Sequence, residues 1–463
     1  MNSIKFGTDG WRGRIADDFT FDNVQLVAQA LVDHLKEQKL ADQGIFVGYD
    51  NRFQSEDFAR AAAEVCSGAG LKTLLSAHSV PSPVTSFTVN KLGLGAGIMI
   101  TASHNPPEWN GFKIKETFGG SAFPTTTQAV EKQLKPKLHY SPSTANLKLH
   151  DPDNDYLAKI SSLTDLEFIR SSGLAIVYDP MYGSGAGYFK KLGIPVSEIR
   201  GARDPLFGGI NPEPLPVNLE ESISFVKETS LANRDRLTVC IVVDGDADRI
   251  AAIDGSGRFI NTHNIFCLLL RYLVVHRQMT GAVVKTFNLS NLIDKLCRQY
   301  DRQLTVTPIG FKHIAKLIRE KDVLLGGEES GGMGIKGNIP ERDGVLSGLL
   351  LLELMAKEKK TLARIMDEIM DEHGYYYYDR IDIHTAKAQD LVKRLTAQPL
   401  KELGGMAVVK VETLDGLKFH FTDESWILFR ASGTEPLLRI YAEGRTPEKL
   451  RLVLGAGESL LAL

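Results

Sequence analysis

The chain has 463 residues, which is too many for one hydrophobic core and predicts roughly three or four domains of ordinary size. Its charged and apolar fractions are those of a globular protein, and its net charge of −3 argues against a general nucleic-acid binder, which would carry a basic excess. An anionic substrate would therefore need cations that are placed locally.

The four cysteines, Cys66, Cys240, Cys267 and Cys297, lie far apart and form no CxxC pair. Three of them stand in apolar runs, so we expect buried thiols in a reducing compartment rather than disulfides or a zinc site.

Two apolar runs, residues 265–275 and 345–355, each contain a charged residue. Both are shorter than the ~20 residues that cross a bilayer, and we interpret them as buried helices. The first residues contain no apolar stretch of signal-peptide length. The sequence therefore favours a cytoplasmic protein that binds neither membranes nor nucleic acid.

The order strand, loop, helix recurs along the chain and favours α/β layers with helices on both faces of a sheet. Three times, an apolar run ends in a polar turn, and a later apolar run ends in a loop of chemically reactive residues. The paired runs are 45–50 and 96–103, then 174–179 and 239–248, then 282–286 and 323–330. We expect three related domains that each give one loop to a shared cleft, because open α/β sheets bind ligands at the carboxyl ends of their strands.

Polar, turn-rich stretches near residues 141–155, 254–257 and 373–374 indicate domain boundaries, and the second is typical of a hairpin turn. After Gly374, tyrosines alternate with charged and β-branched residues, and a helix and further strands follow. We therefore predict three related α/β domains plus a smaller C-terminal α+β domain around a central active-site cleft. The expected domains are residues 1–150, 151–255, 256–372 and 373–463.

A hydroxyl and an imidazole stand side by side in residues 101–106, Thr-Ala-Ser-His-Asn-Pro. Ser103 is a weak nucleophile at its ordinary pKa and needs an activating group. His104 is adjacent, but neighbouring side chains on an extended segment point apart, and a packed or capping histidine is the alternative. Lys113 is a second candidate acid or base.

Three carboxylates alternate directly after an apolar strand, at Asp244, Asp246 and Asp248. They can converge on one hard cation, and oxygen ligands favour Mg²⁺. An EF-hand is excluded because Arg249 stands where that loop needs glycine. An acidic surface turn and a phosphatase that uses Asp244 as nucleophile are the alternatives.

Two further loops carry polar residues among glycines. Glu328 and Ser330 stand in residues 327–332, Gly-Glu-Glu-Ser-Gly-Gly, and suit hydrogen bonds to sugar hydroxyls, although a simple glycine-rich turn has the same composition. Residues 430–436 follow a strand and suit a phosphate, since an arginine fork, two hydroxyls and backbone N–H groups are combined. The phosphate-binding candidates there are Arg430, Ser432, Gly433 and Thr434, and a solvated arginine on a turn is the alternative.

These four loops, in this order, resemble those of the alpha-D-phosphohexomutase family, and the resemblance covers nearly the whole chain. It implies that Ser103 carries a phosphoryl group, one oxygen of which completes the shell of a Mg²⁺ ion held by the three aspartates. It also implies that Glu328 and Ser330 bind the 3- and 4-hydroxyls of the sugar. Arg12 is expected near the phosphoserine, and the expected cationic substrate-binding residues are Arg249, Lys285 and Lys312.

The resemblance implies a mutase that converts a hexose 1-phosphate to the 6-phosphate through a 1,6-bisphosphate, which also acts as an activator. Closure of the C-terminal domain would exclude water. The loop at 327–332 resembles the glucose-type loop, so glucose is the expected sugar, with mannose and glucosamine as alternatives. A non-catalytic sugar-phosphate binder would need neither Ser103 nor the three aspartates. We expect a monomer or a homodimer.

Overall fold

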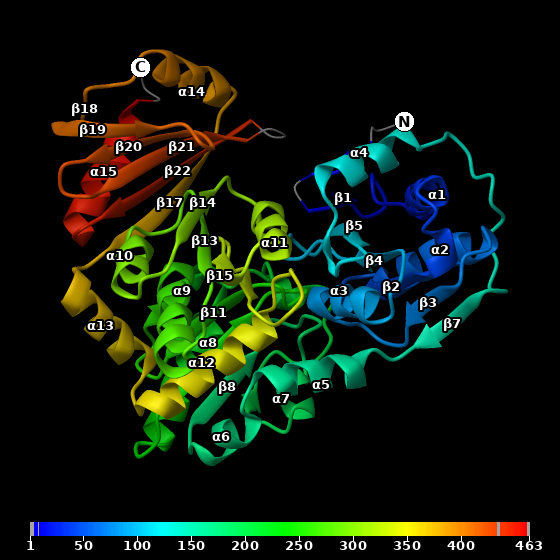
Figure 1. Cartoon of the computed structure of the whole chain (residues 1–463), viewed down its shortest axis with the longest axis horizontal. Coiled ribbons are helices and arrows are strands. Elements are labelled where there is room, and N and C mark those ends of the chain that lie inside the picture. Colours follow the sequence, from blue (N-terminus) through cyan, green and yellow to red (C-terminus); the bar gives the residue numbers. More distant parts are fainter. Residues whose placement is uncertain (1–3, 8, 433–435, 461–463) are drawn as a thin grey trace.

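The structure is a computed structural model, and it describes residues 4–7, 9–432 and 436–460. Within these residues, sheets of seven, five, four and six strands follow one another along the chain, with helices packed on their faces (Figure 1).

The first sheet has the strand order β1-β5-β4-β2-β3-β7, and β6 pairs with β5. Alternate residues of β2 point to opposite faces, so Ile45 and Val47 pack in the core with α1 and α2, whereas Phe46 packs with Val89 of α3. Helices thus cover both faces, as predicted. The elements are β1 (Trp11–Arg14), α1 (Phe21–Glu37), η1 (Ala41–Gln43), β2 (Ile45–Tyr49), α2 (Ser55–Gly68), β3 (Thr73–Ser76), α3 (Ser82–Lys91), β4 (Ala96–Ile100), β5 (Trp109–Glu116), β6 (Gly120–Ser121), α4 (Pro124–Lys132) and β7 (Leu147–His150).

The second sheet has the order β12-β11-β10-β8-β9. Its elements are α5 (Asp153–Leu163), α6 (Leu166–Ser171), β8 (Ala175–Asp179), α7 (Tyr188–Lys191), β9 (Ser197–Glu198), η2 (Phe207–Gly209), η3 (Pro216–Asn218), α8 (Glu220–Ala232), β10 (Thr238–Val243), β11 (Ile250–Asp254) and β12 (Phe259–Ile260). The turn at 254–257 joins β11 to β12, so this sheet extends a few residues beyond the boundary expected after residue 255. The hairpin turn itself was predicted.

The third sheet has the order β14-β13-β15-β16. Its elements are α9 (Thr262–Arg271), a π-helical turn η4 (Tyr272–His276), β13 (Ala282–Thr286), α10 (Leu292–Gln299), β14 (Leu304–Thr307), α11 (Phe311–Glu320), β15 (Val323–Gly327), β16 (Met333–Ile335), α12 (Gly344–Glu358) and α13 (Leu362–His373).

One four-strand arrangement occurs in all three of these sheets. The first strand of each unit along the chain (β2, β8 or β13) lies between two strands that are parallel to it. One of these two (β4, β10 or β15) pairs on its other side with an antiparallel strand (β5, β11 or β16). The corresponding orders are β5-β4-β2-β3, β11-β10-β8-β9 and β16-β15-β13-β14. This repetition confirms the prediction of three related α/β domains.

The three loops of interest occupy the same place in the repeated unit. Each loop joins one of the parallel strands to its antiparallel neighbour, and the loops are the connections β4–β5, β10–β11 and β15–β16. A side chain at Gly245 would meet the Ser103 carbonyl oxygen at 2.6 Å, and one at Gly331 would meet the Ile250 carbonyl oxygen at 2.9 Å. The three connections therefore meet.

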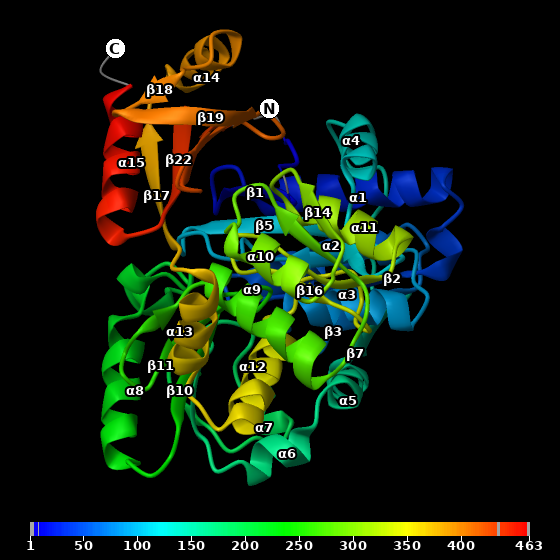
Figure 2. The same ribbon diagram turned by 60° about the vertical axis from the view of Figure 1, so that its left-hand side comes forward.

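The C-terminal domain has a fully antiparallel sheet in the order β17-β22-β21-β20-β19-β18. Both of its helices pack on one face, whereas Trp426, Leu428 and Tyr441 on the other face pack against Phe287 of the third domain. Figures 1 and 2 show it beyond β13 and α10. Its elements are β17 (Tyr377–His384), α14 (Ala388–Ala397), β18 (Glu402–Leu403), β19 (Met406–Glu412), β20 (Leu417–Phe421), β21 (Trp426–Ala431), β22 (Leu437–Gly444) and α15 (Pro447–Ser459).

The two apolar runs are buried helices, as predicted, and they form α9 with its π-helical turn and most of α12. Both belong to one core that also includes strands of the second and third sheets. All four cysteines are free and buried. Among the described residues, no helix is both long enough and apolar enough to span a bilayer.

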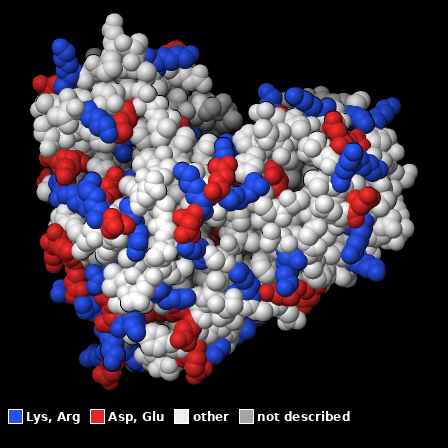
Figure 3. Space-filling model, viewed as in Figure 1, with Lys and Arg blue, Asp and Glu red and all other residues white. Residues whose placement is uncertain are grey.

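The surface is hollowed between the C-terminal domain and the first domain. Figure 3 shows this hollow at the top of the molecule, and acidic and basic side chains are interspersed over the same face.

The four-domain division at 1–150, 151–255, 256–372 and 373–463 remains our proposal.

Candidate active site

Ser103 follows β4 in a tight, buried turn. Its backbone has a φ of 56°, in the left-handed region, and its N–H donates to the Thr101 hydroxyl at 2.8 Å. This conformation is not extended, so the reason for expecting the Ser103 and His104 side chains to point apart does not apply. His104 Nδ1 lies 3.4 Å from Ser103 Oγ.

Arg52 holds the Ser103 turn in place through its backbone carbonyls. It was not among the site residues predicted from the sequence. Its side chain is fully buried, and its two terminal nitrogens donate to four backbone carbonyls, those of Ser103, Asn105, Pro106 and Trp109, at 2.7–3.0 Å. Its Nε lies 3.3 Å from Asp50. The sequence signal that could have revealed this role is an arginine placed just after a strand and an aspartate. A guanidinium has five N–H donors and can therefore bind several backbone carbonyls at once.

The three aspartates gather in the β10–β11 connection. One carboxylate oxygen of each lies within 4.8 Å of the others, and all three residues have zero exposure. They are therefore not an acidic surface turn. Ser103 Oγ donates to Asp244 Oδ2 at 2.8 Å, while Asp244 Oδ1 accepts the backbone N–H groups of Asp248 and Arg249 at 3.0 and 3.1 Å.

The aspartates fit a hard cation. Asp246 Oδ1 and Asp248 Oδ1 are buried and accept no hydrogen bond from the described residues. Buried carboxylate oxygens without a partner are costly, and an oxygen-only donor set is the kind that Mg²⁺ prefers. Ser82, at the start of α3, donates to the other oxygen of Asp246.

Burial and repulsion separate the pKa values of the three carboxyls. Burial, together with Asp246 and Asp248, raises the pKa of Asp244 well above its ordinary value. Burial also acts to raise the pKa of Asp246, but the Lys113 ammonium, the Ser82 hydroxyl and the Arg342 guanidinium together outweigh it, and the net shift is downward. Asp246 therefore holds its negative charge more readily than Asp244 does.

Two cations pair with carboxylates of the cluster. Lys113 Nζ lies 2.8 Å from Asp246 Oδ2, 3.4 Å from Asp248 Oδ2 and 2.9 Å from Asp9 Oδ2. Although burial acts to lower the pKa of Lys113, these carboxylates raise it above the ordinary value. Lys113 is therefore a fixed charge rather than a proton donor near neutral pH.

Arg342 is the second cation, and sequence reasoning missed it. Its Nη2 lies 2.6 Å from Asp248 and 2.7 Å from Asp9, and its Nη1 donates to Glu328 at 2.9 Å. A side chain at Gly332 would place Cβ 2.1 Å from Arg342 Cδ, so glycine at that position makes room for the arginine. No local motif marks Arg342, because its partners lie in three other segments of the chain.

The β15–β16 connection presents Glu328 beside Arg342. Glu328 is buried and Ser330 is half-buried, and the Ser330 hydroxyl has no hydrogen-bond partner among the described residues. The neighbouring Glu329 pairs with Arg380 of the C-terminal domain at 3.4 Å.

The remaining candidates divide into two groups. Arg12 donates to Asn105 of the Ser103 turn, and Arg249 lies 3.9 Å from both Asp244 and Asp248 and 3.5 Å from Glu213. Lys285, by contrast, is buried, paired with Asp294 and bonded to the Ser290 carbonyl at 2.9 Å, at the border with the C-terminal domain. Lys312 is half-buried without a hydrogen bond to any described residue.

The candidate phosphate loop lies at the end of β21. Arg430 Nε donates to Asp415 at 3.0 Å, so this arginine is not a solvated one on a turn. The Ser432 N–H donates to the Leu437 carbonyl at 2.8 Å. Gly433 and Thr434 lie outside the described residues.

Comparisons with known proteins match the whole arrangement. Family models described as phosphoglucomutase/phosphomannomutase alpha/beta/alpha domains I, II and III match residues 3–140, 154–257 and 261–373, and the C-terminal domain model matches 386–455. A phosphoglucomutase/phosphomannomutase of Thermococcus kodakarensis is 29% identical over 98% of this chain and 98% of its own. A phosphoglucosamine mutase of Methanococcus vannielii is 31% identical over 82% of this chain and 84% of its own. The crystal structure of a candidate phosphomannomutase from Thermus thermophilus has a TM-score of 0.88 and 34% identity, covering 100% of this chain and 99% of that one.

Proposed function

Since the chain belongs to the alpha-D-phosphohexomutase family and is therefore a mutase-type isomerase, we propose that it interconverts glucose 1-phosphate and glucose 6-phosphate through a phosphoserine at Ser103. The observation that carries this proposal is the 2.8 Å hydrogen bond from the Ser103 hydroxyl to Asp244, inside a buried acidic cluster. It supports a serine that works beside a bound cation.

The metal in this proposal is Mg²⁺, held by Asp244, Asp246 and Asp248 with an oxygen of the phosphorylated serine. When bound there, it would withdraw negative charge from the oxygens of the transferring phosphoryl group. Asp246 Oδ1 and Asp248 Oδ1, which accept no hydrogen bond from the described residues, support this assignment. Hexose 1,6-bisphosphate is the proposed activator, because it can phosphorylate Ser103 directly.

In the first half-reaction, the phosphate of the 1-phosphate binds at Arg430, Ser432, Gly433 and Thr434. The 6-hydroxyl oxygen attacks the phosphorus, the O6–P bond forms, and the P–Oγ bond to Ser103 breaks. Lys113 and Arg12 supply fixed positive charge near the Ser103 turn. Glu328 and Ser330 bind sugar hydroxyls and orient the ring.

His104 is the proposed carrier of the proton. Burial first, and then the nearby Arg249 and Arg12, lower its pKa well below the ordinary value, so the imidazole is neutral. It accepts the proton of the 6-hydroxyl and donates one to Oγ of Ser103, which lies 3.4 Å from Nδ1.

The second half-reaction is the reverse transfer after the 1,6-bisphosphate has turned around. Ser103 Oγ attacks the phosphorus at position 1, the O1–P bond breaks, and O1 receives the proton. The phosphate loop then holds the 6-phosphate. Because one loop must accept either phosphate, a separate C-terminal domain suits the cycle.

The preference for glucose rests on residues 327–332, Gly-Glu-Glu-Ser-Gly-Gly, which resemble the glucose-type loop. The relatives carry the names phosphomannomutase and phosphoglucosamine mutase as well, so mannose and glucosamine phosphates are the second candidates. A phosphatase with Asp244 as nucleophile is the more remote candidate, because the relatives carry the names of mutases.

The test is a mutase assay with Mg²⁺ and a trace of hexose 1,6-bisphosphate. The 1-phosphates of glucose, mannose, glucosamine and N-acetylglucosamine are compared, and inorganic phosphate is measured in parallel. We expect the fastest conversion with glucose 1-phosphate and no release of phosphate. Ser103→Ala should abolish turnover and leave sugar-phosphate binding largely unchanged, whereas normal turnover of that variant would refute the phosphoserine.

A further inference from the structure

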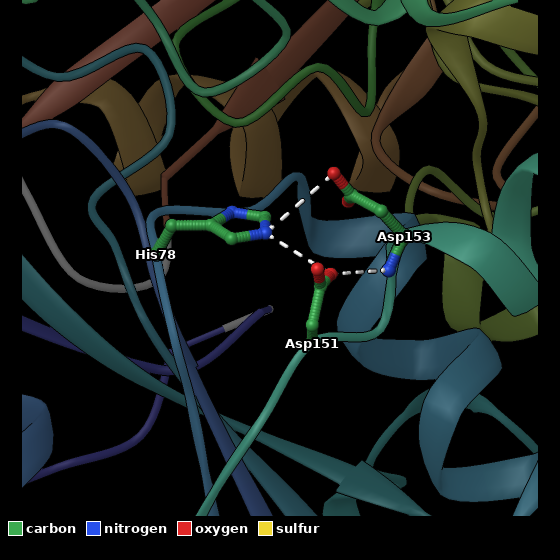
Figure 4. Close-up of side chains that lie close together, drawn as sticks. All are labelled: His78, Asp151 and Asp153. Atoms are coloured by element: carbon green, nitrogen blue, oxygen red, sulfur yellow. Dashed lines mark hydrogen bonds and ion pairs between the residues drawn. The ribbon is translucent and has the colours of Figure 1, made fainter.

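A second group of metal-ligating side chains lies outside the active site, where the first domain meets the second. His78 comes from the connection between β3 and α3, Asp151 from the connection between β7 and α5, and Asp153 is the first residue of α5. Figure 4 shows the imidazole and the two carboxylates turned toward one another. One ligand atom of each lies within 4.8 Å of the others.

The imidazole is oriented for a ligand on Nε2. His78 Nδ1 lies 3.0 Å from the Ser79 carbonyl oxygen, which can only accept, so Nδ1 carries a hydrogen. Nε2 hydrogen-bonds Asp151 Oδ1 at 3.2 Å, and it becomes available to an ion when it gives up its own hydrogen. Metal-ligating histidines characteristically donate their other ring N–H to a backbone carbonyl or a carboxylate. The orientation of His78 therefore matches that of a metal ligand.

The carboxylate of Asp153 is oriented in the same way. The buried Tyr188 hydroxyl donates to its Oδ1 at 2.6 Å, and its Oδ2 faces His78. Asp153 is 7% exposed, whereas the side chain of Asp151 is 58% exposed. One carboxylate is thus rigid, and the other borders solvent, where a water can complete the shell of an ion.

The distances suit a small tetrahedral ion. His78 Nε2 lies 3.2 Å from Asp151 Oδ1 and 3.5 Å from Asp153 Oδ2. Zinc–ligand distances of ~2.0–2.1 Å give a separation of about 3.3 Å between the ligands of a tetrahedron. One imidazole with two carboxylates favours Zn²⁺ over Mg²⁺, which prefers oxygen ligands alone.

Lys191 of α7 is the counter-ion of this cluster. Its Nζ lies 2.5 Å from Asp153 Oδ2, the oxygen that faces His78. The Lys191 side chain is 40% exposed, and its ammonium also lies 4.6 Å from the centroid of the Tyr188 ring. It can therefore move off the carboxylate and retain a favourable contact with the ring.

We propose that His78, Asp151 and Asp153 form a second cation site, which binds Zn²⁺ or a chemically similar divalent ion in competition with Lys191. Such an ion would tie the segment that enters the second domain to the β3–α3 connection of the first. That connection leads to Ser82, which donates to Asp246. The site is independent of the proposed mutase reaction, because none of its ligands belongs to the active site.

The test uses the full chain, freed of metal by a chelator and then supplied with excess Mg²⁺ to occupy the aspartates. Zn²⁺ is titrated by calorimetry, and Co²⁺ is titrated by visible absorption, which is far stronger for tetrahedral than for octahedral Co²⁺. We expect one saturable ion per chain with a tetrahedral Co²⁺ spectrum. His78→Ala or Asp151→Asn should weaken binding about tenfold or more, and Lys191→Ala should strengthen it.

The chain offers a matched control. His139 Nε2 lies 3.3 Å from Asp33, which also pairs with Lys135, but no second carboxylate faces this histidine among the described residues. His139→Ala and Lys135→Ala should leave Zn²⁺ affinity unchanged. Thermal unfolding in chelator checks that each variant folds, and Asp151→Asn alters an exposed side chain. Equal binding by the parent and His78→Ala, or an equal loss in His139→Ala, would overturn the proposal.

Discussion

The Ser103 turn depends on one buried arginine, and this dependence is open to a direct test. Arg52 serves four carbonyls and Asp50 from a fully buried position. Arg52→Met leaves Asp50 buried without its cation, a change that costs about 3–5 kcal/mol. Arg52→Lys keeps the charge but places all donors on one nitrogen, so some carbonyls lose their partner, and we expect a cost of roughly 1–3 kcal/mol.

The same substitutions should slow catalysis, because the carbonyl of Ser103 is among those released. A displacement of a reacting group by about 1 Å can reduce the rate by about 10²-fold. We therefore expect kcat to fall in both variants while KM changes little, since the proposed substrate-binding loops lie in other domains.

Denaturant unfolding followed by tryptophan fluorescence suits this test, because Trp11 and Trp109 both lie in the first sheet next to the turn. Arg60→Lys is the matched control, since Arg60 is exposed on α2. The reasoning would be refuted if Arg52→Lys had the unfolding midpoint and the kcat of the parent. It would also fail if Arg60→Lys lost as much stability as Arg52→Lys.

Three further predictions concern other parts of the site. Gly332→Ala should lower kcat/KM at least about tenfold, because Cβ would lie 2.1 Å from Arg342 Cδ and push that arginine off its carboxylates; a crystal structure of the variant with Arg342 unmoved would contradict this. Burial raises the pKa of Asp343 to about 6, so its charged form destabilises the fold, and this loss of stability develops as pH rises from about 4 to about 6. The free energy of unfolding of Asp343→Asn should therefore increase relative to that of the parent across this pH range, which unfolding measured at several pH values would show. Chelation should abolish mutase activity, which Mg²⁺ restores, yet lower the thermal midpoint only slightly, because Lys113 and Arg342 already pair with Asp246 and Asp248. Collapse of the far-UV circular dichroism in chelator would contradict this.

The repeated domains were predictable because their signals are local. An apolar run that ends in a polar turn can be recognised within about ten residues, and the same succession occurs three times. Parallel strands with buried faces need continuous apolar runs, which is why β2, β8 and β10 are conspicuous in the sequence. The three loops then follow from the rule that ligands bind at the carboxyl ends of such strands.

The groups that hold those loops were not predictable in the same way. Arg342 and Asp9 are in contact although 333 residues separate them, and no local pattern connects the two. The direction of the His104 side chain depends on the left-handed φ of Ser103, and no neighbouring residue type predicts that conformation. Lys285 has the expected residue type, but Asp294 and the Ser290 carbonyl hold it at the domain border.

The charges of the site bring three domains together. Arg342 of the third domain pairs with Asp9 of the first and Asp248 of the second, so the proposed cation site is assembled only when all three domains are in place. Since each of these groups is nearly buried, breaking one contact would leave an unpaired charge, which makes a rigid arrangement favourable. Movement during the reaction is therefore expected at the C-terminal domain.

The pairings of the C-terminal domain agree with that expectation. Arg430 is held by Asp415, which lies in the same domain and also accepts the Ile309 N–H of the third domain at 2.8 Å, so a rotation that breaks the Ile309 contact would leave the proposed phosphate-binding arginine with its counter-ion. By contrast, Arg380 reaches Glu329 of the proposed sugar-binding loop at 3.4 Å and with 28% exposure of its side chain, a weak and partly screened contact. Rotation of the domain would break this outer pair and leave the Arg430 pair intact. Arg380→Gln should therefore alter the rate of domain movement, seen as a change in kcat, without loss of the phosphate-binding loop.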